Sequence, residues 1–404
     1  AEPRPRSGFY VQKTYGMLHS RARRAPAAPA PQPPAAPQPV YDLSTGSVDT
    51  ALFPARSWGR IQKELLYQRP ELLQRGEMQG DAPLRTQIAE YLSVYRGVEC
   101  TPEQIVVGAG IEYLLGCLAH LFSDGMAAIE NPGYFRTRTV LQNSGIPCTL
   151  VDIDREGLPA DALEKSGANL CYLTPSHHFP TGVTMPATRR AQLLAWAAAR
   201  PGRYILEDDY DSEFRFSGLP IPTLQSLDTR GRVIYLNTFS KTIAPALRIS
   251  YMILPQALLA RWRSTMGFYS CAVPSFEQLT LTRFLDGGYF ERHVSRMRKH
   301  YKARLQALLD ILSQPELAVL CEAKQAVAGL HFLLAFHTKE RGAVLAEKLR
   351  EVGLSAPLLS EFYLREAPVD AERCAVVQYA GLDPDAFAKS MRTLAERLTP
   401  EPAG

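Results

Sequence analysis

The chain lacks the cysteine patterns of a disulfide-bonded or zinc-binding protein. Its 404 residues include seven cysteines, and no two of them form a C-x-x-C pair. An odd number of scattered thiols is typical of reduced core residues in a cytoplasmic protein. The sequence therefore argues against a disulfide framework and against a cysteine-ligated metal.

Long apolar runs and a strong charge of one sign are absent as well. No stretch approaches the roughly 18 apolar residues of a membrane span, and no signal-peptide core is recognisable near the N-terminus. The 45 basic residues nearly balance the 41 acidic ones, so bulk charge does not indicate nucleic-acid binding. We expect a cytoplasmic globular protein without membrane contact, and its 46% hydrophobic content suffices for a large core.

Proline and alanine dominate one early segment. Between Pro26 and Pro39 half of the residues are proline, and most of the others are alanine. This composition predicts a semi-rigid, extended linker, which we assign to residues 13–40. Residues 1–12 are too few for a domain, and the sequence does not begin with methionine, so we expect a longer natural chain to precede it.

After the linker, short β-rich apolar runs alternate with helical patterns. The expected strands lie within residues 103–110, 126–134, 147–154, 169–176, 204–211, 232–240 and 248–255. This alternation predicts an α/β domain with a doubly wound, mostly parallel sheet. A long basic helix is expected from Tyr289, followed by a smaller α+β lobe. We expect one main domain over residues 41–404, with a large lobe at about 80–288 and a small lobe at about 41–79 and 289–404.

Three of the expected strands end in chemically useful residues. "YILEDDYD" brings Asp208 and Tyr210, "YLNTFSK" brings Lys241, and "NLCYLTPSHHFPTG" brings His177 and His178. Ligands of such sheets bind at the carboxyl ends of the strands. An amine there can link to an aldehyde cofactor, and a buried carboxylate can keep a pyridine nitrogen protonated. This pairing is the signature of pyridoxal phosphate chemistry.

A phosphate site is expected close by. "VVGAGIEYLL" places glycine at position 110 directly before a helix, where backbone N–H groups can approach an anion. Thr238, Ser240 and Arg248 flank Lys241 and can supply further donors and a cation.

On these residues the chain resembles the fold type I pyridoxal-phosphate aminotransferases over residues 41–404. More narrowly, "TPSHHFPTG", "EDDYDSEF", "NTFSKTIAPALRISYMILP" and "AGLHFLL" resemble the aminotransferase-like half of MocR-type transcription regulators, a branch of the GntR family. In that branch a winged helix-turn-helix precedes a linker and this domain. "RPRSGFYV", within residues 1–12, resembles the last strand of the wing. The resemblance implies a homodimer, and DNA contact through an N-terminal domain that lies outside this sequence.

The resemblance also implies roles for individual residues. Lys241 would carry pyridoxal phosphate, Asp208 would pair with the pyridine nitrogen, and Tyr210 would pair with the phenolic oxygen. The implied phosphate contacts are the amides of Gly110 and Ile111 with Thr238, Ser240 and Arg248. The remaining implied positions are Tyr134 and His178 beside the ring, and Arg136 at the carboxylate of an effector or substrate.

Two departures from the aminotransferase pattern concern binding of the substrate and the cofactor oxygen. Phe179 replaces the asparagine that donates a hydrogen bond to the cofactor oxygen, and Val376 stands about where an arginine binds the substrate carboxylate. Arg373 is three residues earlier and, on a continuous strand, would project from the opposite face. Carboxylate recognition would then depend on Arg136 or Arg138.

A third departure concerns the dimer. Arg75 replaces the tyrosine that reaches the partner's phosphate in aminotransferases, and its side chain can still contact an anion.

Other interpretations of these motifs remain open. The acidic residues 207–211 could bind a metal, which we disfavour because no histidine or cysteine shares their spacing. We expect His177 and His178 to be turn residues rather than catalytic bases, and His331 fits packing and pocket lining equally well. The basic helix around residues 292–304 fits a solvated face better than a DNA contact.

The sequence thus supports an effector-sensing domain of a regulator. In this hypothesis an amino-compound displaces Lys241 and forms an external aldimine, or pyridoxal phosphate itself is the signal. A stand-alone aminotransferase acting on an amino acid is the alternative, with Lys241 as general base. A pyridoxal phosphate lyase or decarboxylase would share the same lysine and aspartate.

Overall fold

The chain divides into two units, Ala1–Pro39 and Val40–Gly404. The computed structural model describes residues 2–4, 8–10, 41–43, 48–69, 72, 76–216 and 221–398. In the first unit the backbone of β1 (Glu2–Arg4) pairs antiparallel with that of β2 (Gly8–Tyr10). The linker expected at 13–40 lies outside the described residues, and the wing-like assignment of residues 1–12 stays a prediction.

The second unit is built on a seven-stranded mixed sheet. From edge to edge its strands are β4 (Ile105–Gly108), β10 (Ser250–Ile253), β9 (Val233–Thr238), β8 (Tyr204–Asp208), β7 (Leu170–Leu173), β5 (Ala127–Asn131) and β6 (Cys148–Asp152). The strands from β9 to β6 run parallel, whereas β10 is antiparallel to both of its neighbours. The predicted α/β fold with a mostly parallel sheet is confirmed.

Helices cover both faces of this sheet, which explains why its strands are continuous apolar runs. Successive side chains alternate between the faces: Val106 packs in the cluster under one set of helices, and Ile105 and Val107 pack under the other. The first face carries α3 (Ile111–Ala119), α4 (Phe135–Asn143) and α8 (Gln256–Met266). The opposite face carries α1 (Ala55–Gln68), α2 (Ala82–Arg96), α5 (Ala160–Lys165), α6 (Ala187–Ala199), α7 (Leu224–Leu227) and α9 (Ser275–Asp286).

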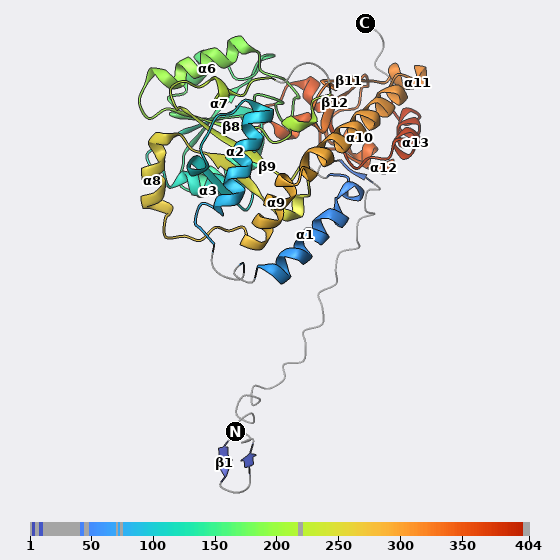
Figure 1. The fold of residues 1–404 in the computed structure, drawn as a ribbon. Coiled ribbons are helices and arrows are strands. Elements are labelled where there is room, and N and C mark those ends of the chain that lie inside the picture. Colours follow the sequence, from blue (N-terminus) through green and yellow to red (C-terminus); the bar gives the residue numbers. More distant parts are fainter. Residues whose placement is uncertain are drawn as a thin grey trace. The chain divides into compact units, whose positions relative to one another are not determined.

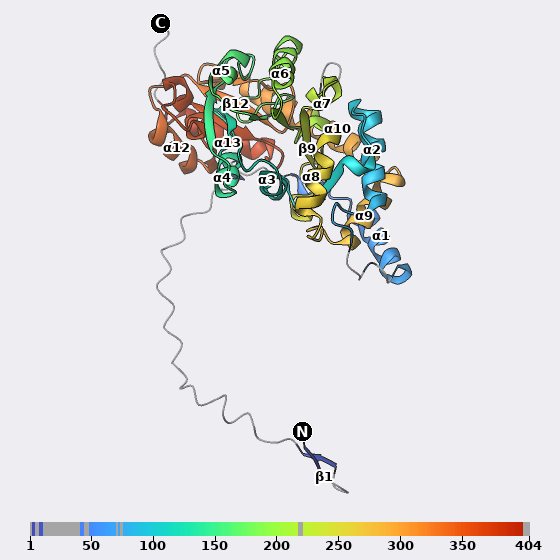
Figure 2. The ribbon, with the colours of Figure 1, turned by 90° about the vertical axis from the view of Figure 1, so that its left-hand side faces the viewer.

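A smaller lobe contains a second, antiparallel sheet. In it β12 (His331–Phe336) lies between β11 (Cys321–Lys324) and β14 (Cys374–Gln378). Two short strands, β3 (Tyr41–Asp42) and β13 (Leu354–Ser355), pair in parallel beside it. The helices of this lobe are α11 (Pro315–Ala318), α12 (Gly342–Glu351) and α13 (Pro384–Ala395). Figure 2 shows α12 and α13 at one end of the unit and α1 and α2 at the other.

Helix α10 (Tyr289–Leu312) joins the two lobes and runs from α9 to α11 (Figure 1). Its buried side chains recur every three or four residues, which is the spacing of an amphipathic helix. Phe290 packs in the core under the large sheet, whereas Leu308 packs in the core of the small lobe. The long basic helix predicted from Tyr289 is therefore present, and one apolar stripe serves both lobes.

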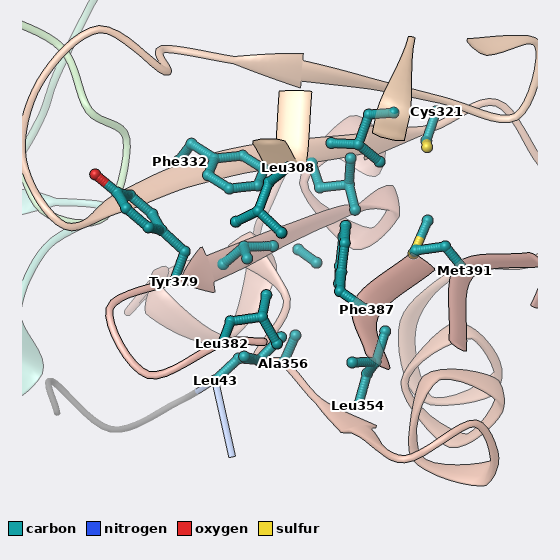
Figure 3. Packing of buried hydrophobic residues seen from close by; sticks show 14 of the residues in the cluster. Leu43, Leu308, Cys321, Phe332, Leu354, Ala356, Tyr379, Leu382, Phe387 and Met391 are labelled. Carbon is teal, nitrogen blue, oxygen red and sulfur yellow. The ribbon is translucent and has the colours of Figure 1, made fainter. Parts of the chain in front are cut away.

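The packing of residues 41–68 bears on where the small lobe starts. Leu43 packs in the small-lobe core next to Leu382 and Ala356 (Figure 3). Helix α1, by contrast, packs through Trp58 and Ile61 in the large-lobe cluster and against α9. We therefore propose that residues 41–43 belong to the small lobe and that α1 belongs to the large one.

No helix within the described ranges is long and apolar enough to cross a membrane.

The small-lobe core makes a testable stability prediction. Phe387 of α13 is fully buried and faces Phe332 and Met391 in this core (Figure 3). Phe387→Ala should lower the free energy of unfolding by about 3–5 kcal/mol, because it removes buried apolar surface and leaves a cavity. Urea unfolding measures this change. The control Val369→Ala, at a half-exposed side chain, should stay within about 0.5 kcal/mol of wild type; equal losses in both variants would contradict the packing.

Candidate cofactor site

The lysine and the aspartate reach the same edge of the sheet because their strands are neighbours. Strands β8 and β9 run parallel with Asp208 opposite Leu236, so both end at the same rim. Lys241 follows three residues after the end of β9. Desolvation by the surrounding protein lowers the pKa of Lys241, and the carboxylates of Asp211 and Asp208 oppose part of this shift. An amine with a lowered pKa is more often neutral and therefore more nucleophilic.

The four carboxylates at the end of β8 and just beyond it, Glu207, Asp208, Asp209 and Asp211, face different surroundings. Glu207 accepts hydrogen bonds from the N–H groups of Leu224 and Gln225, both at 2.8 Å, and thereby holds α7. Asp209 accepts two hydrogen bonds from Arg96, at 2.6 and 3.0 Å. The carboxylates of Glu207 and Asp209 are therefore both engaged in structural hydrogen bonds.

Asp208 and Asp211 are the two carboxylates that act on Lys241. Asp208 is buried, and its Oδ2 accepts a hydrogen bond from the hydroxyl of Tyr172. Its Oδ1 has no hydrogen-bond partner among the described residues. Burial raises the pKa of Asp208 to about 7.

Tyr210 is held by contacts with His177. Its hydroxyl donates to the His177 carbonyl oxygen at 3.1 Å and lies 3.4 Å from His177 Nδ1. Burial raises the pKa of Tyr210 well above its ordinary value, so the hydroxyl keeps its proton as a donor.

The expected phosphate cradle has the backbone shape that an anion needs. Gly110 precedes α3 with φ +106°, and a Cβ there would lie 2.1 Å from Arg248 Nη2. Only glycine fits this position. Ile111 begins α3, where the first N–H groups of a helix have no intrahelical acceptor. The guanidinium of Arg248 reaches this turn and pairs with Glu112 at 3.1 Å.

Hydroxyl groups gather beside the cradle. Thr238 Oγ1 accepts from the Ser240 N–H at 3.1 Å and from the Ser250 hydroxyl at 2.8 Å. Thr238 in turn donates to the Ser240 hydroxyl oxygen at 2.9 Å. The structure thus brings Thr238 and Ser240 into one hydrogen-bonded group next to Lys241 in the chain.

The residues expected beside the ring occupy two other loops. Tyr134 precedes α4, and its ring meets Phe179 edge to face, with centroids 5.9 Å apart. His178 Nδ1 lies 2.7 Å from the Thr181 hydroxyl, and its Nε2 lies 3.5 Å from a carboxylate oxygen of Glu130. Burial lowers the pKa of His178 to about 3 and raises that of Glu130 to about 8, so both are neutral near pH 7.

The arginines proposed for carboxylate binding are placed differently from one another. Arg136 is exposed on the first turn of α4, where its guanidinium opposes the burial-raised pKa of Tyr134. Arg373 ends a 3₁₀ turn, and β14 begins only at Cys374. The argument from side-chain alternation along a strand therefore does not apply to Arg373, which corrects our expectation. Arg75 lies outside the described residues.

The two departures from the aminotransferase pattern meet in one apolar cluster. Val376 is fully buried with Leu333 and Phe362, and Phe179 packs against this group. The rings of Phe179 and Phe362 meet edge to face at 5.2 Å. Where an aminotransferase carries an amide and a guanidinium, this site has hydrocarbon.

The sequence patterns did not reveal a group that forms next to Tyr210. Candidate ligand atoms of His177, Asp211 and His331 lie within 4.8 Å of one another. No histidine shares the spacing of Asp211 along the chain, yet the fold brings His177, which follows β7, and His331, which begins β12, beside it. The histidines in "SHH" and "AGLH" were visible, but their convergence depends on long-range packing.

Comparison with known proteins gives the family. The family model described as "Aminotransferase class I and II" matches residues 38–366. The chain belongs to this family. Its cofactor is pyridoxal phosphate, as the resemblance implied.

Relatives place the chain in the MocR-type branch. It is 36% identical over 367 residues to the HTH-type transcriptional regulator YdeL of Bacillus subtilis, covering 90% of this chain and 79% of YdeL. It is 32% identical over 355 residues to the probable rhizopine catabolism regulatory protein MocR of Rhizobium meliloti, covering 86% and 70%. An archaeal alanine:glyoxylate aminotransferase superposes with a TM-score of 0.79 at 26% identity, over 90% of this chain and 91% of that one.

The residues present fit pyridoxal phosphate. A protonated pyridine nitrogen is a charged donor, which is the partner that Asp208 Oδ1 lacks, and such a donor would return Asp208 to its ionised form. The glycine at 110 lets the Arg248 guanidinium lie close to the start of α3, and this cation and the first N–H groups of the helix are the donors that a phosphate binds.

The raised pKa of Asp208 predicts a pH effect on the cofactor-free protein. Because its folded-state pKa lies above the unfolded value, the neutral carboxyl stabilises the fold at low pH, and this contribution is lost between about pH 4 and pH 7. Asp208→Asn should therefore be more stable than wild type by about 2–4 kcal/mol near pH 8, and nearly equal to it near pH 4. Urea unfolding at both pH values measures this. A constant difference between the proteins would contradict a buried, neutral Asp208.

Proposed function

We propose that this chain is the cofactor-binding and ligand-sensing part of a MocR-type transcription regulator. It binds pyridoxal phosphate, recognises a small amino-compound through that cofactor, and acts in the cytoplasm as a homodimer. The observation that carries the proposal is the apolar cluster of Phe179, Val376 and Phe362, which stands where a transaminase needs polar groups.

Each site residue has a proposed part in holding the cofactor. Lys241 would attach it, Asp208 would hold a proton on the pyridine nitrogen, and Tyr210 would donate to the phenolic oxygen. The proposed phosphate ligands are the amides of Gly110 and Ile111, the hydroxyls of Thr238 and Ser240, and the Arg248 guanidinium. Tyr134 and His178 would line the ring, and Arg136 would bind the carboxylate of the ligand.

When bound, pyridoxal phosphate supplies an aldehyde that links reversibly to Lys241 or to the amine of a ligand. The residues around it favour recognition over turnover. The side chain of Phe179 donates no hydrogen bond, and that of Val376 cannot bind a carboxylate, so these two positions give a substrate none of the polar contacts expected there in an aminotransferase. The apolar walls also exclude water.

The link to transcription is supported by the relatives. YdeL is named an HTH-type regulator and MocR a regulatory protein, and this chain covers most of each. We propose that the ligand changes the relative stability of two conformations of this domain, and that these conformations present a helix-turn-helix differently to DNA. A ligand that bound both conformations equally would change nothing.

A cytoplasmic location is supported by the thiols. Within the described residues all seven cysteines are free, and they range from half-buried to buried, as expected in a reducing compartment.

A stand-alone aminotransferase is the second candidate. It is favoured by the lowered pKa of Lys241, since an amine that is more often unprotonated can accept a proton from a substrate carbon. The similarity to the archaeal aminotransferase extends over nine-tenths of both chains.

Titration of the cofactor-loaded protein separates the two candidates. A panel of L- and D-amino acids and simple amines is added, and the absorbance of the bound cofactor is followed before and after a 2-oxo acid. We expect one class of amine to change the spectrum stably, without consumption of the oxo acid. Lys241→Ala is the control and should show no such exchange. Consumption of the oxo acid over many turnovers would instead establish an aminotransferase.

Arg136 provides a specificity test. Arg136→Gln should weaken binding of a carboxylate-bearing amine by about 1.5–3 kcal/mol, roughly tenfold or more, and should leave the corresponding amine without a carboxylate unchanged. Affinities follow from the same titration. Arg155→Gln, at another exposed arginine, is the matched control. Equal weakening of both ligands would argue against a carboxylate contact.

An exposed aromatic patch supports the homodimer. Phe268 and Tyr269 are 70% and 47% exposed, with ring centroids 4.3 Å apart, and Tyr113 of α3 lies beside Tyr269 around a small pocket. Exposed apolar patches of this kind mark protein contacts.

Replacing Phe268 and Tyr269 together by serine should weaken dimerisation by about tenfold or more, because large aromatic side chains dominate interface energies. Sedimentation velocity over a concentration series measures this. Val369→Ser, at an exposed apolar side chain of the small lobe, is the control. An unchanged dimer in the double variant would place the interface elsewhere.

A further inference from the structure

Three buried polar side chains from three strands meet where the lobes touch. His177 follows β7, Asp211 follows β8, and His331 begins β12 of the small lobe. His177 Nδ1 lies 2.8 Å from Asp211 Oδ2, and both side chains are only 3% exposed. The ring of His331 packs against that of His177, with centroids 4.3 Å apart and planes tilted by 39°. We call these residues the interlobe triad.

The small-lobe backbone is pressed directly against this triad. A Cβ on Gly329 would lie 2.1 Å from His177 Cε1 and 2.4 Å from Asp211 Oδ2. The Gly329 N–H donates to the Phe214 carbonyl oxygen at 2.9 Å, and its own carbonyl accepts from the Tyr379 hydroxyl at 2.6 Å. A displacement of His177 or Asp211 would therefore also displace the turn that leads into β12.

The hydrogen-bond partners define the protonation of the triad. His331 Nε2 lies 3.1 Å from the Pro180 carbonyl oxygen, which can only accept, so the ring carries its hydrogen on Nε2. Burial, together with the charges of His177 and Lys241, holds the pKa of His331 well below its ordinary value. His331 is therefore neutral, and its contact with His177 is a tilted packing of two rings rather than an ion pair.

Asp211 connects this triad to the lysine. It is one of the two carboxylates that act on the Lys241 amine, and it is the one that also faces His177. Asp211 follows the end of β8 by three residues and Lys241 follows the end of β9 by three residues, and these strands are parallel neighbours, so both side chains start from the same rim of the sheet.

We propose that Asp211 is the counter-ion of the released Lys241 amine. Whether Asp211 is paired with that amine then changes the contacts of His177 and His331, and through them the position of the small lobe. A positive charge on Lys241 attracts the carboxylate of Asp211 and weakens the hydrogen bond that Asp211 accepts from His177. The ring contact between His177 and His331, at the start of β12, then loosens. Without that charge the triad tightens. The three are positioning residues. The inference rests on the proposed function only in taking Lys241 as the amine that a ligand releases.

The same atoms could in principle bind a divalent metal. In such a site both imidazoles direct a ring nitrogen at the ion, about 2.0–2.1 Å away. His177 Nδ1 already faces Asp211 Oδ2 at 2.8 Å, and this contact favours a hydrogen-bonded pair with His331 packed against it. Binding of a metal by these residues would therefore overturn the proposal, and the test includes it as an outcome.

The test uses full-length, cofactor-free protein, so that failure of cofactor or effector binding does not affect it. Amide hydrogen exchange of residues 326–336 is measured in wild type and in Lys241→Met, which removes the charge at similar length. Amide exchange of this segment should be slower in Lys241→Met by about fivefold or more, because Asp211 then interacts with His177 and no longer with a charged amine. In an Asp211→Asn background the same lysine substitution should have no effect on this segment.

Controls and a second variant keep the outcome decisive. In the exposed Asp124→Asn background the effect of Lys241→Met should persist in full. His331→Phe keeps an aromatic ring and should abolish the effect even if Asp211→Asn does not fold, whereas His337→Phe, exposed just after the same strand, should not. Persistence of the effect in Asp211→Asn or in His331→Phe would overturn the proposal.

Histidine ring ¹⁵N spectra of the same samples test for a metal. We expect His331 to be neutral with hydrogen on Nε2, and to be unaffected by added zinc. Stoichiometric zinc binding that shifts both His177 and His331 would establish a metal site and overturn the triad.

Discussion

The amine of Lys241 and the carboxylates of Asp208 and Asp211 lie together at one edge of the sheet, where the protein has removed most of the surrounding water. Removing charges from water is costly unless each has a partner, so the rest of the site is organised around their pairing. Asp208 is left with one oxygen that only a donor can satisfy, and Asp211 is shared between the lysine and His177. The site is thus prepared for a cofactor that brings a charged donor of its own.

The surrounding fold explains why these three groups meet. Strands β8 and β9 are parallel neighbours, so residues that follow them arrive at the same rim. The remaining acidic residues, Glu207 and Asp209, are occupied by α7 and by Arg96 and cannot compete. Glu207 and Asp209 leave the chain on the side opposite to Asp208, because side chains alternate along an extended chain, and Asp211 lies beyond the end of the strand.

Much of this could be predicted from the sequence, and the limits have physical causes. The strands were predictable because a sheet buried on both faces needs continuous apolar runs, and Lys241 and Asp208 were predictable because they follow such runs directly. The cluster of Phe179 with Val376 and the ring contact of His177 with His331 were not, because each joins residues far apart in the chain. Arg373 was misjudged because the start of β14 is set by pairing with β12, which no local pattern specifies.

The length of α10 has a consequence for how the molecule can move. Its 24 residues span roughly 36 Å as one continuous helix, and its side chains belong to the hydrophobic cores of both lobes. At α10 the two lobes are therefore joined by a continuous helix and not by a flexible linker. A rotation of the small lobe must either bend this rod or pivot it within the core under the large sheet, so a small displacement near Phe290 becomes a several-fold larger one near Leu312.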